Sequence, residues 1–285
     1  MATKSQAPKS SPATAGSAPS GGGRESHSKA IVLSVALRVI AAGPLVVLAC
    51  IWVIFAILSP YFFTQDNLTN VLVQSSSVAL LALGALLVVM VGSLDVSLGS
   101  TVGLCTIVGA VLFRDHPELG WLVVPAMLAV GIAVGFVNAF VIVGLRIGNA
   151  FIVTLGMLYV LQSLSAVVLG GTQLPGQPEY MLDLANNDLL GVPGPVVLVL
   201  VAGGALSFLL NRVAWGRWIV AIGGSADAAE KVGIPVRRVL FSVYVLASVL
   251  AAVTGVLVAG LNDAGAADSG TSILLAIAAD RKSVV

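Results

Sequence analysis

Charged residues are scarce in this 285-residue chain. Lys, Arg, Asp and Glu together make up 9% of it, whereas about 25% is usual for a soluble domain. Apolar residues (AVILMFWYC) make up 58%, and the mean hydropathy is +1.05. So few charges cannot cover the surface of a soluble globular domain. The composition therefore indicates a chain whose solvent is mostly lipid.

Reactive and metal-ligating residues are also few. Cys50 and Cys105 lie in apolar runs without a second thiol or a histidine at ligand spacing, which argues against a disulfide framework and a zinc site. The net charge of +1 excludes a basic nucleic-acid footprint. The sequence has no G-x-x-x-x-G-K-[ST] phosphate loop and no recognisable catalytic constellation. We expect a protein that is not an enzyme and holds no metal or cofactor of its own.

Long gaps between charged residues define the predicted fold. A membrane-spanning helix needs about 17–25 mainly apolar residues, and seven gaps are long enough. They are Val39–Gln65, Asn67–Leu94, Val96–Phe113, Leu119–Leu145, Ile147–Pro178, Leu189–Asn211 and Val239–Asn262. An eighth apolar run, Ser269–Ala279, has room for only about 16 Å of helix. We expect an all-α membrane protein, a polytopic helical bundle of about seven full crossings plus a truncated eighth.

The few basic residues orient these crossings, because Lys and Arg in short loops stay on the cytoplasmic side. With the N-terminus inside, the residues that fall inside are Lys4, Lys9, Arg24, Lys29, Arg38, Arg146, Arg212, Arg217, Lys231, Arg237 and Arg238. Of the basic residues that precede the seventh crossing, only Arg114 falls on the outer side of the membrane. Residues 1–29 are rich in Ser, Ala, Pro and Gly, as in a disordered tail. We expect a multi-pass protein of the cell (inner or plasma) membrane with a disordered cytoplasmic tail over 1–29.

Several polar side chains interrupt the apolar runs. Asp95 has two interpretations: it caps the helix that follows, or it marks a pathway through the membrane. Asn138, Thr154 and Gln162 either join helices by hydrogen bonds or line a path for a hydroxylated solute. A further cluster, formed by Asn67, Asn70, Gln74, Ser75, Ser76 and Ser77, faces a water-filled vestibule or is simply the outer end of a helix.

Small residues recur at four-residue spacing in two runs, Gly99 with Gly103 and Gly131 with Gly135. Such pairs let helices approach closely inside a membrane bundle, although they also arise by chance in glycine-rich chains.

The inner loop between Arg212 and Arg238 contains a predicted short helix outside the bilayer. Ser225 is its N-cap, Asp227 and Glu230 fall in its early turns, and Gly233 followed by Pro235 ends it. Such a helix either docks into a partner protein or lies at the lipid interface.

Two segments of this loop, WGRWIVAIGGS at 215–225 and DAAEKVG at 227–233, match motifs of a known family. They resemble the coupling loop and, with Asp in place of Glu, the E-A-A-x-x-x-G motif of the permease subunits of bacterial ATP-binding-cassette importers for ribose and related sugars. Residues 92–100 resemble the family's G-G-I-D-L-S-V-G-S, with Ser93 in place of the second glycine. Gly135, Asn138 and the run 151–156 match further patterns, whereas Gln162 stands where the family usually has arginine. The resemblance covers about 67–279.

The resemblance implies a function and a set of partners. Residues 30–279 would form the transmembrane permease domain, with 213–238 as the cytoplasmic coupling loop. A separate ATPase subunit would bind ATP, an extracellular or periplasmic binding protein would deliver the solute, and a second permease copy or a related permease would complete the path. Coupling to the ATPase would fall to Gly216, Arg217, Asp227, Ala228, Ala229 and Gly233. The expected substrate path would include Asp95, Asn138, Thr154 and Gln162.

The last residues depart from the family pattern. Family members continue past a stretch like Ala276–Ala279 into further crossings, whereas this sequence reads DRKSVV at 280–285. We interpret 280–285 as an aberrant C-terminal end that reflects a truncation or frameshift. The alternative to a working permease is therefore a transport-incompetent remnant that only inserts or binds the ATPase.

Overall fold

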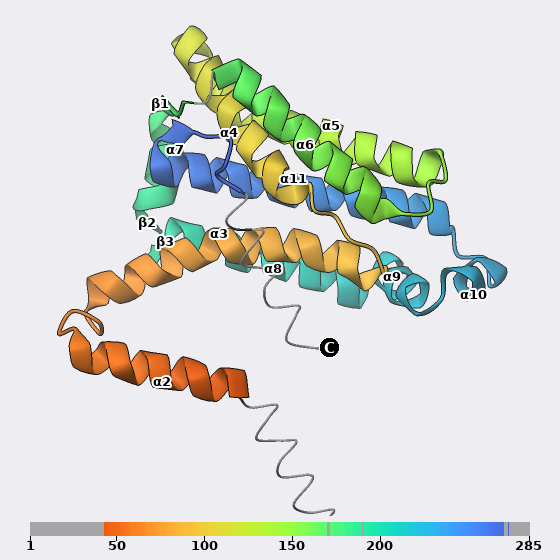
Figure 1. The fold of residues 1–285 in the computed structure, drawn as a ribbon, viewed down its shortest axis with the longest axis horizontal. Helices are drawn as coiled ribbons and strands as arrows, with labels where there is room; N and C mark the ends of the chain where they lie inside the picture. The colour runs from red at the N-terminus through yellow and green to blue at the C-terminus, as the bar shows by residue number, and fades with distance from the viewer. Residues whose placement is uncertain (1–42, 170–171, 190, 271–272, 274–285) are drawn as a thin grey trace, which may run out of the picture. The chain divides into compact units, whose positions relative to one another are not determined.

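The computed structural model describes residues 43–169, 172–189, 191–270 and 273. Contacts divide the chain into two units, residues 1–64 and 65–285. Figure 1 shows the helices α2 (Gly43–Leu58), α3 (Gln65–Met90), α4 (Leu98–Asp115), α5 (Val123–Ala139), α6 (Ala150–Leu169), α7 (Glu179–Asn186), α8 (Gly194–Arg212), α9 (Ala214–Gly224), α10 (Ala226–Lys231) and α11 (Val236–Asn262). A 3₁₀ turn η1 (Pro117–Leu122) precedes α5, and a π-helical segment η2 (Phe140–Gly144) follows it.

The first unit contributes one described helix, α2. Its apolar side chains include Trp52 and Phe55, which contact Phe62 just beyond the helix at ring-centroid distances of 5.5 and 6.1 Å. Residues 39–42 of the first predicted crossing, the tail over 1–29 and most of Ser269–Ala279 lie outside the described residues, as does the end at 280–285.

The helices of the second unit confirm the prediction of a helical, multi-pass membrane protein. Six of its helical segments are long and apolar enough to span a bilayer: 65–90, 98–115, 117–144, 150–169, 194–212 and 236–262. Each falls on one of the predicted crossings after the first. Four strands of two residues add a minor β component between helices: β1 (Leu174–Pro175) pairs antiparallel with β4 (Ala264–Gly265), and β2 (Asp188–Leu189) with β3 (Val192–Pro193).

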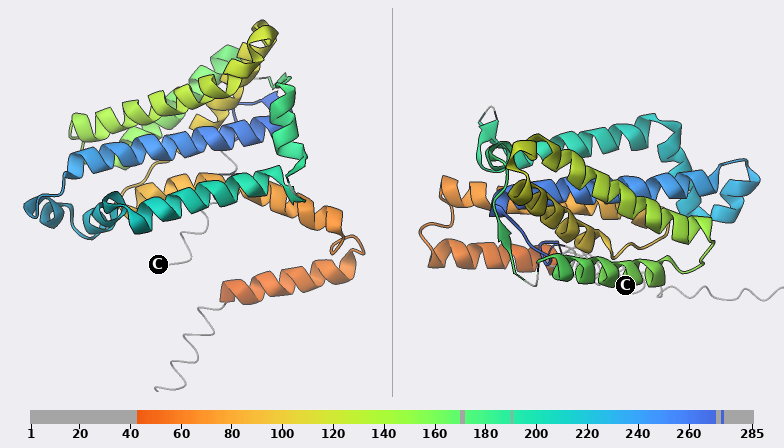
Figure 2. Two further views of the ribbon diagram at one scale, coloured as in Figure 1. Left: turned by 180° about the vertical axis from the view of Figure 1, so that it is seen from behind. Right: turned by 90° about the horizontal axis from the view of Figure 1, so that it is seen from above.

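Helix α11 is the centre of the second unit and packs on α3, α4 and α5 (Figure 2). Its buried face includes Tyr244, Ala247 and Ala251. The close approach of α5 rests on small residues: a Cβ at Gly131 would lie 2.8 Å from the Ser248 carbonyl oxygen, and one at Gly135 would lie 2.8 Å from the Val245 Cα. The Gly131–Gly135 spacing is therefore a packing interface.

The Gly99–Gly103 pair has a different neighbour. A Cβ at Gly103 would overlap the backbone carbonyl of Ala267, and the carbonyl of Gly99 lies against Gly270. The segment 266–270, just after β4, thus runs along α4. Thr106 of α4 fixes this segment, because its hydroxyl accepts a hydrogen bond from the Ala266 amide at 3.1 Å.

The two ends of the bundle carry different elements (Figure 1). We call the end with α7 and both strand pairs the α7 end; α3 and α8 begin there and α11 finishes there. The opposite end, with α9 and α10, is the α10 end. Helices α3 and α8 finish at the α10 end, and α6 and α11 begin there. The linker 91–97 turns back from this end into the bundle, so that α4 begins inside it.

Candidate functional site

The linker between α3 and α4 places a carboxylate inside the bundle. Gly92 adopts a positive φ of 76°, a conformation that glycine reaches without strain, and there the chain reverses after α3. Asp95 is 6% exposed. Its Oδ1 accepts hydrogen bonds from the Ser97 amide at 2.9 Å and the Ser97 hydroxyl at 2.6 Å. Asp95 therefore shapes the turn that begins α4, and the N-terminal dipole of that helix favours its negative charge.

Three helices close around this turn. Asn138 of α5 is fully buried, and its Nδ2 donates to the Ser97 hydroxyl at 2.8 Å. Thr154 of α6, also fully buried, accepts a long hydrogen bond of 3.4 Å from the Val96 amide. From α11, the Tyr244 hydroxyl lies 2.6 Å from the Ser93 hydroxyl. We call these residues the polar layer: Ser93, Asp95, Ser97, Asn138, Thr154 and Tyr244.

The polar layer retains unused hydrogen-bonding capacity. Among the described residues, Asp95 Oδ2 and Asn138 Oδ1 have no hydrogen-bond partner, and neither does the hydroxyl of Ser248 next to Gly135. Buried polar atoms are nearly always paired with protein or water. The layer can therefore accept water or a hydroxylated molecule at the level where α4, α5 and α11 meet.

Three of the four residues expected along a path meet here, and the fourth does not. Gln162 lies eight residues beyond Thr154 on α6, about 12 Å along the helix, and is half-buried. The sequence marked Ser93 only as a departure from the family's second glycine, and it did not single out Tyr244, because a tyrosine within an apolar run is typical of a core. Only the fold shows that Tyr244 faces the linker.

Helix α9 begins the loop at the α10 end. Gly216 is buried and leaves no space for a side chain, since a Cβ there would overlap the backbone of Leu210. Glycine at this position lets α9 fold back directly after α8. Arg217 is exposed on α9. These two coupling candidates thus differ, one setting the path of the chain and the other presenting a charge to solvent.

Helix α10 has the predicted cap and stop. The Ser225 hydroxyl accepts a hydrogen bond from the Ala228 amide at 3.2 Å, which confirms Ser225 as the N-cap. Asp227 and Ala228 are exposed, whereas Ala229 is buried in the main hydrophobic core. Gly233 ends the helix with φ of 86°. One face of α10 is therefore packed on the bundle through Ala229, and the opposite face is exposed.

A cation on α11 joins this loop region to α5. Arg237 donates from Nη2 to the carbonyl oxygens of Val143 at 3.1 Å and Gly144 at 3.4 Å. Both carbonyls belong to η2, at the end of a helix, where carbonyl groups lack helical partners and attract cations. The sequence marked Arg237 only as a basic residue near a crossing.

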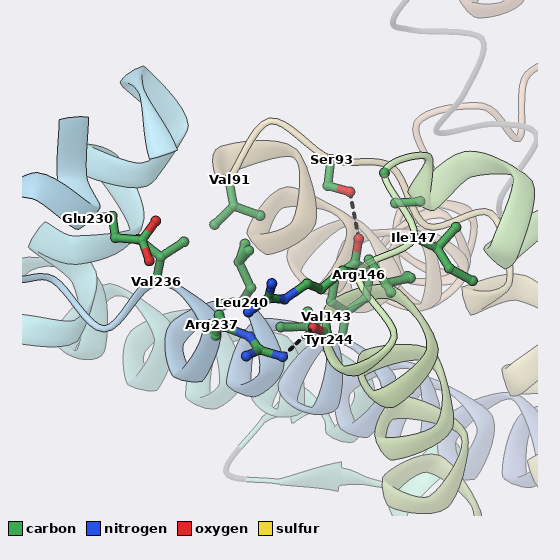
Figure 3. Close-up of a pocket in the computed structure, with 13 residues that line it drawn as sticks. Val91, Ser93, Val143, Arg146, Ile147, Glu230, Val236, Arg237, Leu240 and Tyr244 are labelled. Carbon is green, nitrogen blue, oxygen red and sulfur yellow. Dashed lines mark hydrogen bonds between the residues drawn. The ribbon is translucent and has the colours of Figure 1, made fainter. Parts of the chain in front are cut away.

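A cavity of about 520 Å³ opens beside this contact (Figure 3). Its lining includes Glu230 of α10, Arg146, Arg237, Tyr244 and Ser93. Figure 3 shows the Ser93–Tyr244 and Arg237–Val143 hydrogen bonds on the wall of this one space. The cavity therefore connects the end of α10 to the polar layer.

No metal-binding cluster of three or more His, Cys, Asp or Glu side chains occurs in the part of the chain that the structure describes. Cys105 is buried and its thiol lies 3.4 Å from the Met127 carbonyl oxygen, as expected for a packing residue.

Comparison with known families gives a match over residues 67–279, to the family described as "Branched-chain amino acid transport system / permease component". This range contains the polar layer, α9, α10 and most of α3. No solved structure matches the chain.

Individual relatives give a consistent result. The autoinducer 2 import system permease protein LsrC of Klebsiella pneumoniae subsp. pneumoniae is 35% identical over 215 residues, 74% of this chain and 61% of the relative. The probable ABC transporter permease protein y4mJ of Sinorhizobium fredii is 31% identical over 252 residues, 88% of this chain and 71% of the relative. The autoinducer 2 import system permease protein LsrD of Salmonella typhimurium is 33% identical over 217 residues, 72% of this chain and 64% of the relative. The chain thus spans about two thirds of the length of these relatives.

Proposed function

This chain belongs to the branched-chain amino acid transport system / permease component family, and we propose that it is the transmembrane subunit of an ABC importer that moves a ribose-like monosaccharide across the cell membrane. A separate ATPase subunit supplies the energy, an external binding protein delivers the solute, and a second permease copy or a related permease completes the path. Relatives named as import-system permeases support the direction of transport. The family is one of transporter membrane components, so the chain is not an enzyme.

The observation that carries this proposal is the form of α10. It is a short helix with a serine cap, an exposed acidic first turn and a buried Ala229, at the end of a bundle of membrane-spanning helices. A short amphipathic helix fits a groove on another protein through its exposed face. The segment resembling the E-A-A-x-x-x-G motif covers this helix, so the ATPase is the partner we assign to it.

The charges of the two ends support a cytoplasmic α10 end. The basic residues Arg146, Arg212, Arg217, Lys231, Arg237 and Arg238 all belong to elements of that end. The α7 end carries acidic residues instead, among them Glu179, Asp183, Asp188 and Asp263, and its Arg114 pairs with Asp115. Basic residues are retained on the cytoplasmic side. The α7 end therefore faces the binding protein.

The geometry supports a route from the ATPase to the solute path. A displacement of α10 acts on α11 through the short connection 232–235, and Arg237 passes it to η2 at the end of α5. Helices α5 and α11 both carry residues of the polar layer, Asn138 and Tyr244. A movement of either helix thus changes the layer, as alternating access requires.

Site-specific photo-crosslinking tests this assignment. A photoreactive residue at the exposed Ala228 should crosslink to the ATPase subunit, and one at the exposed Glu179 on α7 should crosslink to the binding protein. The assignment fails if the ATPase is captured from position 179, or if position 228 captures no ATPase in an assembled complex.

A further inference from the structure

A second cavity, of about 520 Å³, lies at the α7 end between α3, α7, α11 and the segment after β4. Its polar lining consists of Asn70, Gln74, Ser77, Asn186, Asn262 and Ser269. Three of these belong to the polar cluster at the start of α3, for which a vestibule was one of the two interpretations. Its volume lies within the range of small-molecule sites, about 300–1,000 Å³. The fold thus adds residues from α7 and α11 to that cluster.

The amide side chains of this cavity have hydrogen-bonding groups to spare. Asn70, Gln74 and Asn262 are exposed and form no side-chain hydrogen bond to another described residue. Asn186 uses one group, donating from Nδ2 to the Leu182 carbonyl oxygen at 2.9 Å. Each free amide offers two donor hydrogens and one acceptor oxygen. Such groups match the hydroxyls of a sugar, each of which both donates and accepts.

The described residues that line the cavity include no ionisable side chain. The neighbouring Asp263 does not line the cavity. Its Oδ1 instead accepts a hydrogen bond from the Gln177 amide at 2.9 Å. A carboxylate, an ammonium or a phosphate that enters this cavity would lose hydration without meeting an opposite charge. The acidic residues of the α7 end add repulsion against anions.

We propose that this cavity is a solute-binding site that selects neutral polyhydroxylated molecules over amino acids and phosphorylated sugars, with Gln74 and Asn262 as its specificity-determining residues. The inference rests on the proposed function and adds to it the location and the chemistry of selection. Gln74 comes from α3 and Asn262 from the end of α11, so a solute held by both is released when these helices separate.

Competitive uptake in cells that express the chain with its ATPase and binding protein tests the proposal. In wild type, unlabelled ribose should compete with labelled ribose, whereas leucine and ribose 5-phosphate should not. The substitutions Gln74→Leu and Asn262→Leu should each raise the KM for ribose roughly tenfold, the effect of losing one or two hydrogen bonds. Asn262→Gln keeps the amide, so its KM for ribose should stay close to that of the wild type.

Asn211→Leu is the matched control, because Asn211 is an exposed amide on α8 at the opposite end and bonds only within its own helix. Membrane abundance is measured for each variant, and the ratio of ribose to leucine inhibition is independent of abundance. An unchanged KM in both cavity variants, with uptake intact, overturns this site and leaves the transport assignment standing. Absence of uptake by the wild-type complex overturns both.

Discussion

The Arg237 guanidinium lies 3.1 Å from the carbonyl oxygen of Val143 and joins the start of α11 to η2, the segment that follows α5. These residues are 94 positions apart in the sequence. The contact stands between α10, which we assign to the ATPase, and the polar layer around Asp95. It therefore provides a direct test of how movement reaches the solute path.

Replacing Arg237 with methionine should uncouple solute uptake from ATP hydrolysis. The apolar side chain cannot donate to the η2 carbonyls, so the start of α11 loses its hydrogen bonds to the segment that follows α5. We expect ATP hydrolysis to continue while solute uptake per ATP falls several-fold, measured in proteoliposomes. The adjacent Arg238→Met is the control, since the Arg238 side chain is exposed and forms no hydrogen bond to another described residue. Equal losses in both variants would contradict the assignment.

Gly233→Val should impair docking of the ATPase without preventing insertion. The φ of 86° at Gly233 costs about 1–2 kcal/mol for a residue with a Cβ, and more for a β-branched one. The end of α10 must then change shape. We expect less ATPase to co-purify with the variant, whereas Gly224→Ala, at a site with open space in the same loop, should behave as wild type. Normal co-purification of the Gly233 variant would count against α10 as the docking helix.

The substitutions Asp95→Asn and Asp95→Leu should differ in their effect on stability, because Oδ1 of Asp95 is hydrogen-bonded whereas Oδ2 has no partner among the described residues. Asp95→Asn keeps an acceptor for the Ser97 amide and hydroxyl, whereas Asp95→Leu leaves both buried donors unpaired, at a cost of about 1–3 kcal/mol. We expect the thermal unfolding midpoint in detergent to fall clearly only for Asp95→Leu. If uptake falls in Asp95→Asn at unchanged stability, the free Oδ2 acts on the solute path. Equal destabilisation by both substitutions would contradict the role of Oδ1 in the turn.

Gly131→Val should disrupt the bundle. The new Cβ would meet the Ala252 Cβ at 2.5 Å and the Ser248 carbonyl oxygen at 2.8 Å, so α5 and α11 must move apart. Overpacking of this kind costs about 1–3 kcal/mol. The control is Gly156→Val on α6, where an added Cβ meets nothing within 4 Å. The yield of monodisperse protein in size-exclusion chromatography should fall for Gly131→Val only; equal yields would show that the close approach is dispensable.

The membrane-spanning helices of the second unit could be predicted from the sequence, because charge is so costly in lipid that its absence marks each of them. The cap and stop of α10 were predictable for a similar reason, since Ser225 and Gly233 act on the backbone within a few residues. Gly131 and Gly135 were recognisable as a possible interface, but the identity of the facing helix was not, because it depends on the packing of α11.

The long-range part of the site could not be predicted. Asp95, Asn138 and Thr154 were chosen one at a time as polar residues in apolar runs, and the fold brings them together because the linker turns back into the bundle. Gln162 was chosen by the same criterion, yet it lies about two turns away along α6. Tyr244, Arg237 and Asn262 carry no local signal, since only their distant neighbours distinguish them from core, loop and helix-end residues.

Solute uptake by the purified complex tests the central claim most directly. The chain is reconstituted in proteoliposomes with its ATPase and binding protein, with ATP inside, and uptake of labelled ribose is followed beside that of autoinducer 2. We predict accumulation of a neutral hydroxylated solute that requires ATP hydrolysis, the binding protein and an intact α10. A fully assembled complex that hydrolyses ATP but moves neither solute, nor any other neutral hydroxylated solute, would contradict the claim.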